Sequence, residues 1–228
     1  MKSFRFSLAG ATWSGRLIAC LSATLAMVVT STFSAMVLDE TSPLLLGPIA
    51  ASAVLIFTLP TSPLSQPWRV IGGHVISAVI GYGAAILIPD TALAAELSLG
   101  LSMLVMTLTR SFHPPGGGMA VTTALAGPEV AKWGILFPFL PVGLNAIALV
   151  LTGVAFHALF RQSYPHHPSQ EPAGAPAATS GVLPEDLDRA LEQMGATFDI
   201  SREDLNRLLD HAEANAIERR RGPTARMG

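Results

Sequence analysis

The 228-residue chain is half apolar, and only 13% of its residues are charged. Soluble domains carry about a quarter charged residues, so this composition favours a protein that sits in lipid. The net charge of −2 gives no reason to expect nucleic acid as a partner. Cys20 is the single cysteine, which excludes an intramolecular disulfide and a cysteine-based zinc site.

Six apolar segments follow one another along the chain, at about 17–38, 44–59, 70–88, 91–109, 114–127 and 133–160. Four of them are long enough to cross a hydrocarbon core of about 30 Å as helices. The first is too long for the apolar region of a signal peptide, so we interpret it as a membrane span. The sequence therefore predicts an all-α, polytopic membrane helix bundle in contact with the lipid bilayer.

The second and fifth segments are shorter, and both open with proline and glycine. The order long, short, long occurs in residues 17–88 and again in 91–160, which indicates two inverted three-segment repeats. In each repeat the short member is a half-helix broken by proline and glycine. Interrupted apolar segments at matching places in two halves are a pointer to a transporter site built from discontinuous helices.

Loop charges indicate the orientation, because lysine and arginine gather on the cytoplasmic side of a membrane. With six crossings, Arg16, Arg69, Arg110 and Arg161 all lie inside, and only Lys132 lies outside. If the two short segments instead dip in and return, Arg69 and Arg110 move outside and the bias nearly disappears. We therefore expect six crossings with both termini cytoplasmic, and whether the short segments cross completely stays open.

The composition changes after the membrane domain, which we place at residues 1–161. Residues 162–181 are rich in Pro, Ala, Ser and His, which is typical of a flexible linker. Two amphipathic helices are expected within 182–220. The first starts at Pro184, and the second starts at Ser201 with Asp204 three residues on, close to a capping box. Residues 221–228 are expected to be disordered.

The starts of the two short segments are the strongest candidates for a site. Non-helical backbone is tolerated in lipid only where protein or water surrounds it, so these starts should face the interior of the bundle. Inverted symmetry would point the helix N-termini, at Gly47-Pro48 and at Gly116-Gly117-Gly118, toward a shared centre near the bilayer midplane. Free N–H groups and the positive ends of two helix dipoles would make that centre an anion site.

Several side chains are expected to complete this anion site. His113 and Arg110 would attract and orient the ion, and Asn145 and Thr122 would replace part of its hydration shell. His74 is a further ionisable group inside the membrane. Each has a structural alternative: the arginine as an interfacial anchor, the histidines as partners of freed carbonyls, and the glycines as close helix packing. The expected substrate-binding set is His113, Pro114, Pro115, Gly116, Gly117, Gly118, Gly47, Pro48, Arg110, His74, Asn145 and Thr122.

The apolar core shows few groups for other chemistry. No carboxylate is predicted within it, which favours a path for an anion over a path for a cation. No nucleophile–base pair and no cluster of metal ligands is visible in the sequence, so we expect no enzyme, no metal and no cofactor.

The stretch LTRSFHPPGGG and the stretch GPIAASAVLIFTLPTSPLSQPWRVIGGHVISAVIG resemble the HPP family of integral membrane proteins, and the likeness covers most of residues 15 to 160. The resemblance implies a multi-spanning protein, here of a bacterial inner membrane, with His113, Pro114, Pro115 and the glycines after them as functional residues. Family members in chloroplast membranes have been linked to nitrite transport. The tail is similar to the connector that leads into CBS domains in many bacterial members, and we expect a member without those domains.

These features predict a membrane transporter of a small monovalent anion, with nitrite or a nitrate-like ion implied by the resemblance. The alternative is a membrane-embedded signalling or scaffold module that presents the tail helices to a partner. A homo-oligomer is compatible with either function.

Overall fold

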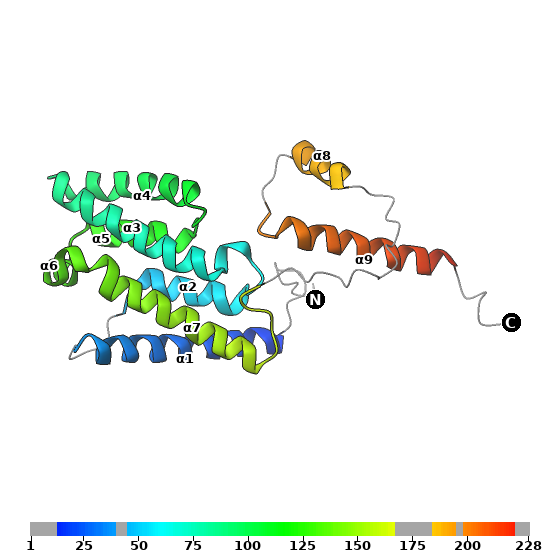
Figure 1. The fold of residues 1–228 in the computed structure, drawn as a ribbon, viewed down its shortest axis with the longest axis horizontal. Helices are drawn as coiled ribbons and strands as arrows, with labels where there is room; N and C mark the ends of the chain where they lie inside the picture. Colours follow the sequence, from blue (N-terminus) through cyan, green and yellow to red (C-terminus); the bar gives the residue numbers. More distant parts are fainter. Residues whose placement is uncertain (1–12, 40–44, 167–183, 195–197, 222–228) are drawn as a thin grey trace, which may run out of the picture. The chain divides into compact units, whose positions relative to one another are not determined.

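The computed structural model describes residues 13–39, 45–166, 184–194 and 198–221 of the chain. They divide into two units after His166, which we call the membrane unit and the tail unit. All regular elements within these ranges are helices, which confirms the all-α class (Figure 1).

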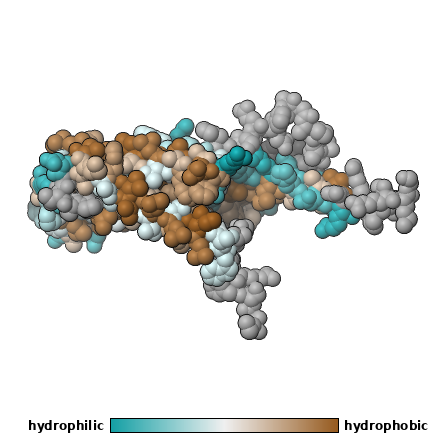
Figure 2. Space-filling view, turned by 90° about the horizontal axis from the view of Figure 1, so that it is seen from below, coloured by the Kyte–Doolittle hydropathy of each residue, from teal (hydrophilic) through white to brown (hydrophobic). Residues whose placement is uncertain are grey.

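Four helical stretches in the described residues are long and apolar enough to cross a membrane. They are α1 (Trp13–Val37), α3 (Pro67–Leu87), α4 (Thr91–Leu108) and the stretch Pro138–Leu159. Apolar side chains cover the body of the membrane unit on the face drawn in Figure 2, and hydrophilic side chains gather at its left end. This apolar surface and the four candidate spans agree with a multi-pass membrane protein.

The two short segments are helices that cannot cross a bilayer alone. α2 (Gly47–Thr58) has 12 residues and α5 (Pro114–Ala124) has 11. At 1.5 Å per residue they measure only about 16 to 18 Å. Proline stands at the start of each, where its missing N–H costs no helical hydrogen bond.

The last apolar segment, expected as one span over 133–160, is not one continuous α-helix. It consists of α6 (Pro128–Trp133), a 3₁₀ turn at Gly134–Leu136, a π-helical turn at Pro138–Gly143 and α7 (Leu144–Leu159). Two prolines, Pro138 and Pro141, remove two backbone donors here. The N–H of Val142 consequently reaches back five residues to the carbonyl of Phe137, at 3.1 Å.

Cross-helix contacts fix which helix ends lie together. The Asn145 side chain donates to Ser34 Oγ (2.8 Å), so α7 begins where α1 ends. His157 Nε2 lies 3.0 Å from the Ile56 carbonyl, so α2 and α7 end together. Trp68 Nε1 donates to the Thr109 carbonyl (3.2 Å), so α3 begins where α4 ends. The helices thus alternate in direction, as Figure 1 shows.

This alternation sorts the charged residues of the membrane unit between its two ends. One end, which we call the arginine end, holds Arg16, Arg69, Arg110 and Arg161. The opposite end, the acidic end, holds Asp39, Asp90, Glu129 and Lys132.

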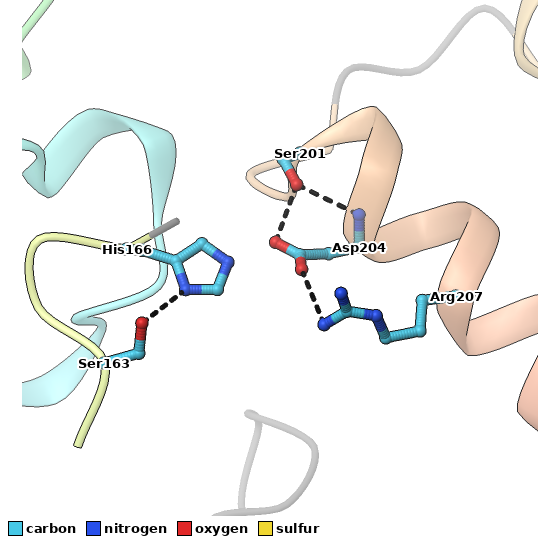
Figure 3. Close-up of polar contacts among 5 residues, drawn as sticks. All are labelled: Ser163, His166, Ser201, Asp204 and Arg207. Atoms are coloured by element: carbon cyan, nitrogen blue, oxygen red, sulfur yellow. Dashed lines mark hydrogen bonds and ion pairs between the residues drawn. The ribbon is translucent and has the colours of Figure 1, made fainter. Parts of the chain in front are cut away.

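The tail unit contains α8 (Pro184–Met194), which begins at the expected Pro184, and α9 (Arg202–Arg221), which begins one residue after the expected Ser201. Ser201 Oγ accepts from the N–H of Asp204 (3.0 Å) and donates to its carboxylate (2.6 Å), which forms the expected cap (Figure 3). Arg202 forms an ion pair with Asp188 and so joins the two helices. The expected linker from 167 onward and the expected disordered end from 222 onward lie outside the described residues.

Candidate functional site

The two short helices overlap side by side near the middle of the membrane unit. The Cβ that a side chain on Gly118 would have lies 3.6 Å from Pro48 Cγ, while Ser52 Oγ lies 2.7 Å from His113 Nε2. The first turns of α2 and α5 therefore pass each other antiparallel. His113 lies against Gly73, which is about 9 Å along α3 from its start, so α5 begins well inside the membrane unit.

A buried polar cluster occupies this crossing. Ser52 on α2 joins His74 on α3 to His113, which precedes α5: its Oγ lies 2.7 Å from Nε2 of each ring. The two imidazole rings stand edge to face with their centroids 5.1 Å apart. All three residues are 0% exposed. We call these three residues the His–Ser–His cluster.

Backbone contacts determine where the protons of this cluster lie. His113 Nδ1 is 2.8 Å from the Leu64 carbonyl, which can only accept, so Nδ1 carries a proton and donates it. In neutral His113, Nε2 is then an acceptor, and the Ser52 hydroxyl donates to it. Ser52 Oγ in turn accepts from Nε2–H of His74. The tautomers are thus assigned from hydrogen bonding, and all donors run in one direction.

Among the described residues, one nitrogen of the cluster has no hydrogen-bond partner, and the Ser52 hydroxyl has a further acceptor within reach. Nδ1 of His74 is buried and has no hydrogen-bond partner among the described residues. The Pro48 carbonyl lies 3.0 Å from Ser52 Oγ, one helical turn before it. Ser52 has one hydroxyl proton, so it can donate to His74 Nε2 or to the Pro48 carbonyl only when His113 Nε2 carries a proton of its own. The cluster can accordingly hold one extra proton while Ser52 stays hydrogen-bonded to both histidines.

Close packing of α3 against α5 depends on glycine. A Cβ on Gly73 would lie 2.7 Å from His113 Cβ, and one on Gly116 would lie 2.8 Å from the Gly73 carbonyl. Gly81 approaches the Ala120 carbonyl even more closely. Such contacts leave no room for a side chain, so these glycines set the distance at which His74 and His113 share Ser52.

The start of α5 offers fewer free amides than an anion site formed by a helix N-terminus would need. Pro114 and Pro115 have no N–H, and the N–H of Gly116 donates to the His113 carbonyl at 2.8 Å. At α5 this differs from the sequence-based expectation of free N–H groups that face a common centre. The polar groups that meet at the crossing are the side chains of the His–Ser–His cluster.

Three residues of the expected set that have polar side chains lie outside the cluster. Arg110 is exposed, in a left-handed conformation (φ 55°) at the end of α4. The Asn145 amide is occupied by Ser34 and the Pro141 carbonyl. Thr122 Oγ1 donates to the Gly118 carbonyl of its own helix. The structure joins His74 to His113 through Ser52, which stands one turn after Pro48, and it places Gly118 against Pro48.

The segment after α7 is fastened to the loop that contains Leu64. His157, which is fully buried, contacts the Ile56 carbonyl, and Tyr164 Oη donates to the Ser65 carbonyl at 3.0 Å. The backbone N–H of His166 donates to Gln66 Oε1 at 2.9 Å, and its ring lies 3.3 Å from Ser163 Oγ (Figure 3). The loop whose Leu64 carbonyl orients His113 is thus also hydrogen-bonded to the segment that follows α7.

The distance between Ser52 Oγ and His113 Nε2 is also that of a nucleophile and its base, a pair that the sequence analysis did not foresee. However, Ser52 Oγ is contacted by a second histidine and by the Pro48 carbonyl, and it is fully buried. A hydroxyl engaged on three sides has no open approach for a substrate carbonyl. This arrangement suits proton storage better than nucleophilic attack.

Comparison with known proteins places the chain in a family. A family model described as HPP, transmembrane region, matches residues 9–165, so this protein belongs to the HPP family of integral membrane proteins. Two transmembrane proteins of Dictyostelium discoideum are similar to it. One is 38% identical over 133 residues, which cover 56% of this chain and 46% of the relative. The other is 35% identical over 127 residues, which cover 53% of this chain and 40% of the relative. The matches span less than half of each relative, and no solved structure matches.

Proposed function

We propose that the membrane unit is a path for a small monovalent anion, which binds beside the His–Ser–His cluster. The observation that carries this proposal is the chemistry of the interior. Among the described buried residues of this unit, the ionisable ones are His74, His113, His157 and Tyr164, and the rest of the polar set is Ser, Thr and Asn. The histidines can become positive, and tyrosine stays neutral at physiological pH, so such an interior favours an anion over a cation.

The arginine end supports an orientation for this path. Arginine and lysine gather on the cytoplasmic side, so the arginine end would face the cytoplasm and the acidic end the opposite compartment. Both ends of the membrane unit, at α1 and after α7, would then be cytoplasmic. The family resemblance makes nitrite the first ion to test and a bacterial inner membrane the expected location.

The described conformation would be a closed state of this path, because the whole cluster is inaccessible to solvent. An ion would reach it only after α2 and α5 move apart. At the cluster, α2 meets α5 through the Ser52–His113 hydrogen bond and the contact of Pro48 with Gly118, whereas α3 and α5 are locked by glycine contacts. We therefore expect α2 to be the moving element.

Flux into liposomes tests the proposal. Purified protein should pass nitrite, nitrate or chloride faster than protein-free liposomes, and His113→Ala should lower this rate at least tenfold. His211→Ala on α9 is the matched control, because it removes an exposed histidine of the tail unit. Equal rates with and without protein, for all three ions, would refute the transport function.

A signalling or scaffold module remains the second candidate, favoured by the hydrogen bonds that tie Tyr164 and His166 to Ser65 and Gln66, next to Leu64. The result that would support it is loss of a bound partner on removal of α8 and α9, with no ion flux by the intact protein. Labelling of Ser52 by a fluorophosphonate would instead indicate a serine hydrolase and would contradict both functions.

A further inference from the structure

We infer that the anion moves together with one proton, which the His–Ser–His cluster takes up at Nδ1 of His74. This inference rests on the proposed anion path and specifies its second substrate. The geometry points to His74 because its Nδ1 is the one ring nitrogen of the cluster without a partner among the described residues. His113 Nδ1 is held by Leu64, and both Nε2 atoms are held by Ser52.

Proton uptake can be written so that every bond balances. A proton from water forms an N–H bond at His74 Nδ1. The N–H bond at His74 Nε2 breaks as its proton passes to Ser52 Oγ, while the original hydroxyl proton of Ser52 passes to His113 Nε2. His74 ends neutral, Ser52 keeps one proton, and His113 becomes an imidazolium that donates to Leu64 and Ser52. The net change is one proton and one positive charge.

The proton cannot continue past His113. Its Nδ1–H is bonded to the Leu64 carbonyl, which accepts a hydrogen bond but cannot pass a proton on. The cluster is therefore a proton store with one entrance, and the proton must leave by the nitrogen through which it arrived. A store of this kind suits a cycle in which a proton and an anion are bound and released together.

The surroundings make the proton and the anion depend on each other. α2 and α5 contain no charged side chain. The titratable groups on the other elements that pack around the cluster, including the turn before His113, are Arg16, Cys20, Arg69, Tyr82, Glu96, Arg110 and His157. Among the described residues, the side chains of the cluster hydrogen-bond to one another and to the carbonyls of Leu64 and Pro48. A lone positive charge in this interior is unfavourable, and an anion beside it offsets that cost, so each ligand raises the affinity for the other.

The coupling can be measured with intact protein in liposomes that contain a pH-sensitive dye, with the membrane voltage clamped. Nitrate is the suitable ion, because its acid is too strong to cross lipid in neutral form. We expect inward nitrate movement to acidify the interior by one proton per ion, at a rate that does not change with voltage. Nitrate movement that carries current without acidification would overturn the proton coupling and leave the anion path intact. Absence of movement for nitrate, nitrite and chloride would overturn the anion path itself.

A pair of serine variants tests the assignment to the cluster. Ser52→Ala interrupts the chain between the two rings, and we expect the rate of coupled movement to fall at least tenfold. Ser102→Ala is the matched control: Ser102 is also fully buried, but its hydroxyl bonds only the Leu99 carbonyl of its own helix, so the rate should stay within twofold. A Ser52→Ala protein that keeps the full rate with one proton per ion would overturn the assignment. If that variant does not fold, the ratio measured on the unaltered protein still decides the coupling.

Discussion

The backbone of Gly73 supports the side chain of His113 directly. A Cβ on Gly73 would fall 2.7 Å from the Cβ of His113 and 3.0 Å from the Ser111 carbonyl, both of which belong to the turn that leads into α5. The position of the His113 ring, and hence its hydrogen bond to Ser52, depends on the absence of a single methyl group one residue before His74.

Gly73→Ala should therefore disturb the cluster without replacing any of its three side chains. We expect the extra methyl to push the Ser111–His113 turn away from α3, to lower the free energy of unfolding by about 1–3 kcal/mol, and to reduce ion flux. Thermal unfolding in detergent and liposome flux are the measurements. Gly83→Ala, on the same helix but with open space around its Cβ, is the control and should leave both unchanged. Equal effects of the two variants would contradict this role of Gly73.

The helices themselves could be predicted from local features of the sequence. Apolar length marks the four spans, and Pro and Gly mark the starts of α2 and α5, so the expected bounds differ from the observed ones by a few residues. The exception is the final segment. Its apolar composition predicts one continuous helix, but a π-helical turn at Pro138 and Pro141 interrupts it. Their missing donors favour a π-helical turn, and hydropathy alone carries no sign of it.

The site was predictable only in part, for a physical reason. His74 and His113 are recognisable because ionisable residues inside a membrane are rare. Ser52 is one of many serines in apolar helices, and most of the others bond a carbonyl within their own helix, as Ser98 does. Its role comes from the antiparallel overlap of α2 and α5, whose residues are about 60 positions apart. Likewise, the sequence suggests free amides at HPPGGG, whereas two consecutive prolines remove them.

The positions of Arg69 and Glu129 give a direct test of topology. Arg69 lies in the first turn of α3 at the arginine end, and Glu129 lies in α6 at the acidic end. In a Cys20→Ala background, we expect Arg69→Cys to react with an impermeant maleimide only after the membrane is opened. Glu129→Cys should react in intact cells. Labelling of both from the same side would contradict the inverted arrangement.

The cap at Ser201 stabilises the start of α9. Its hydroxyl satisfies the N–H of Asp204, which otherwise lacks a helical partner. Ser201→Ala should lower the stability of this helix by about 1 kcal/mol and raise hydrogen exchange in its first turn. Ser201→Asp, which keeps an acceptor at this position, should restore most of the protection. Unchanged exchange in the alanine variant would show that the cap contributes nothing.

Tyr164 should make the membrane unit sensitive to alkaline pH. Burial raises the pKa of its hydroxyl, so the folded state favours the neutral form, which donates to the Ser65 carbonyl. The stability that this gives is complete below the ordinary tyrosine pKa of about 10 and is lost progressively as the pH rises above it. Tyr164→Phe should cost about 1 kcal/mol at pH 7, because one hydrogen bond is lost, and should weaken the loss of stability at higher pH. Tyr82→Phe, at the only other tyrosine, is the matched control and should leave the alkaline loss in place. Unfolding in detergent at neutral and alkaline pH measures the cost at pH 7 and the loss of stability at high pH. If Tyr164→Phe loses as much stability at alkaline pH as the unaltered protein, Tyr164 is not the origin of that loss.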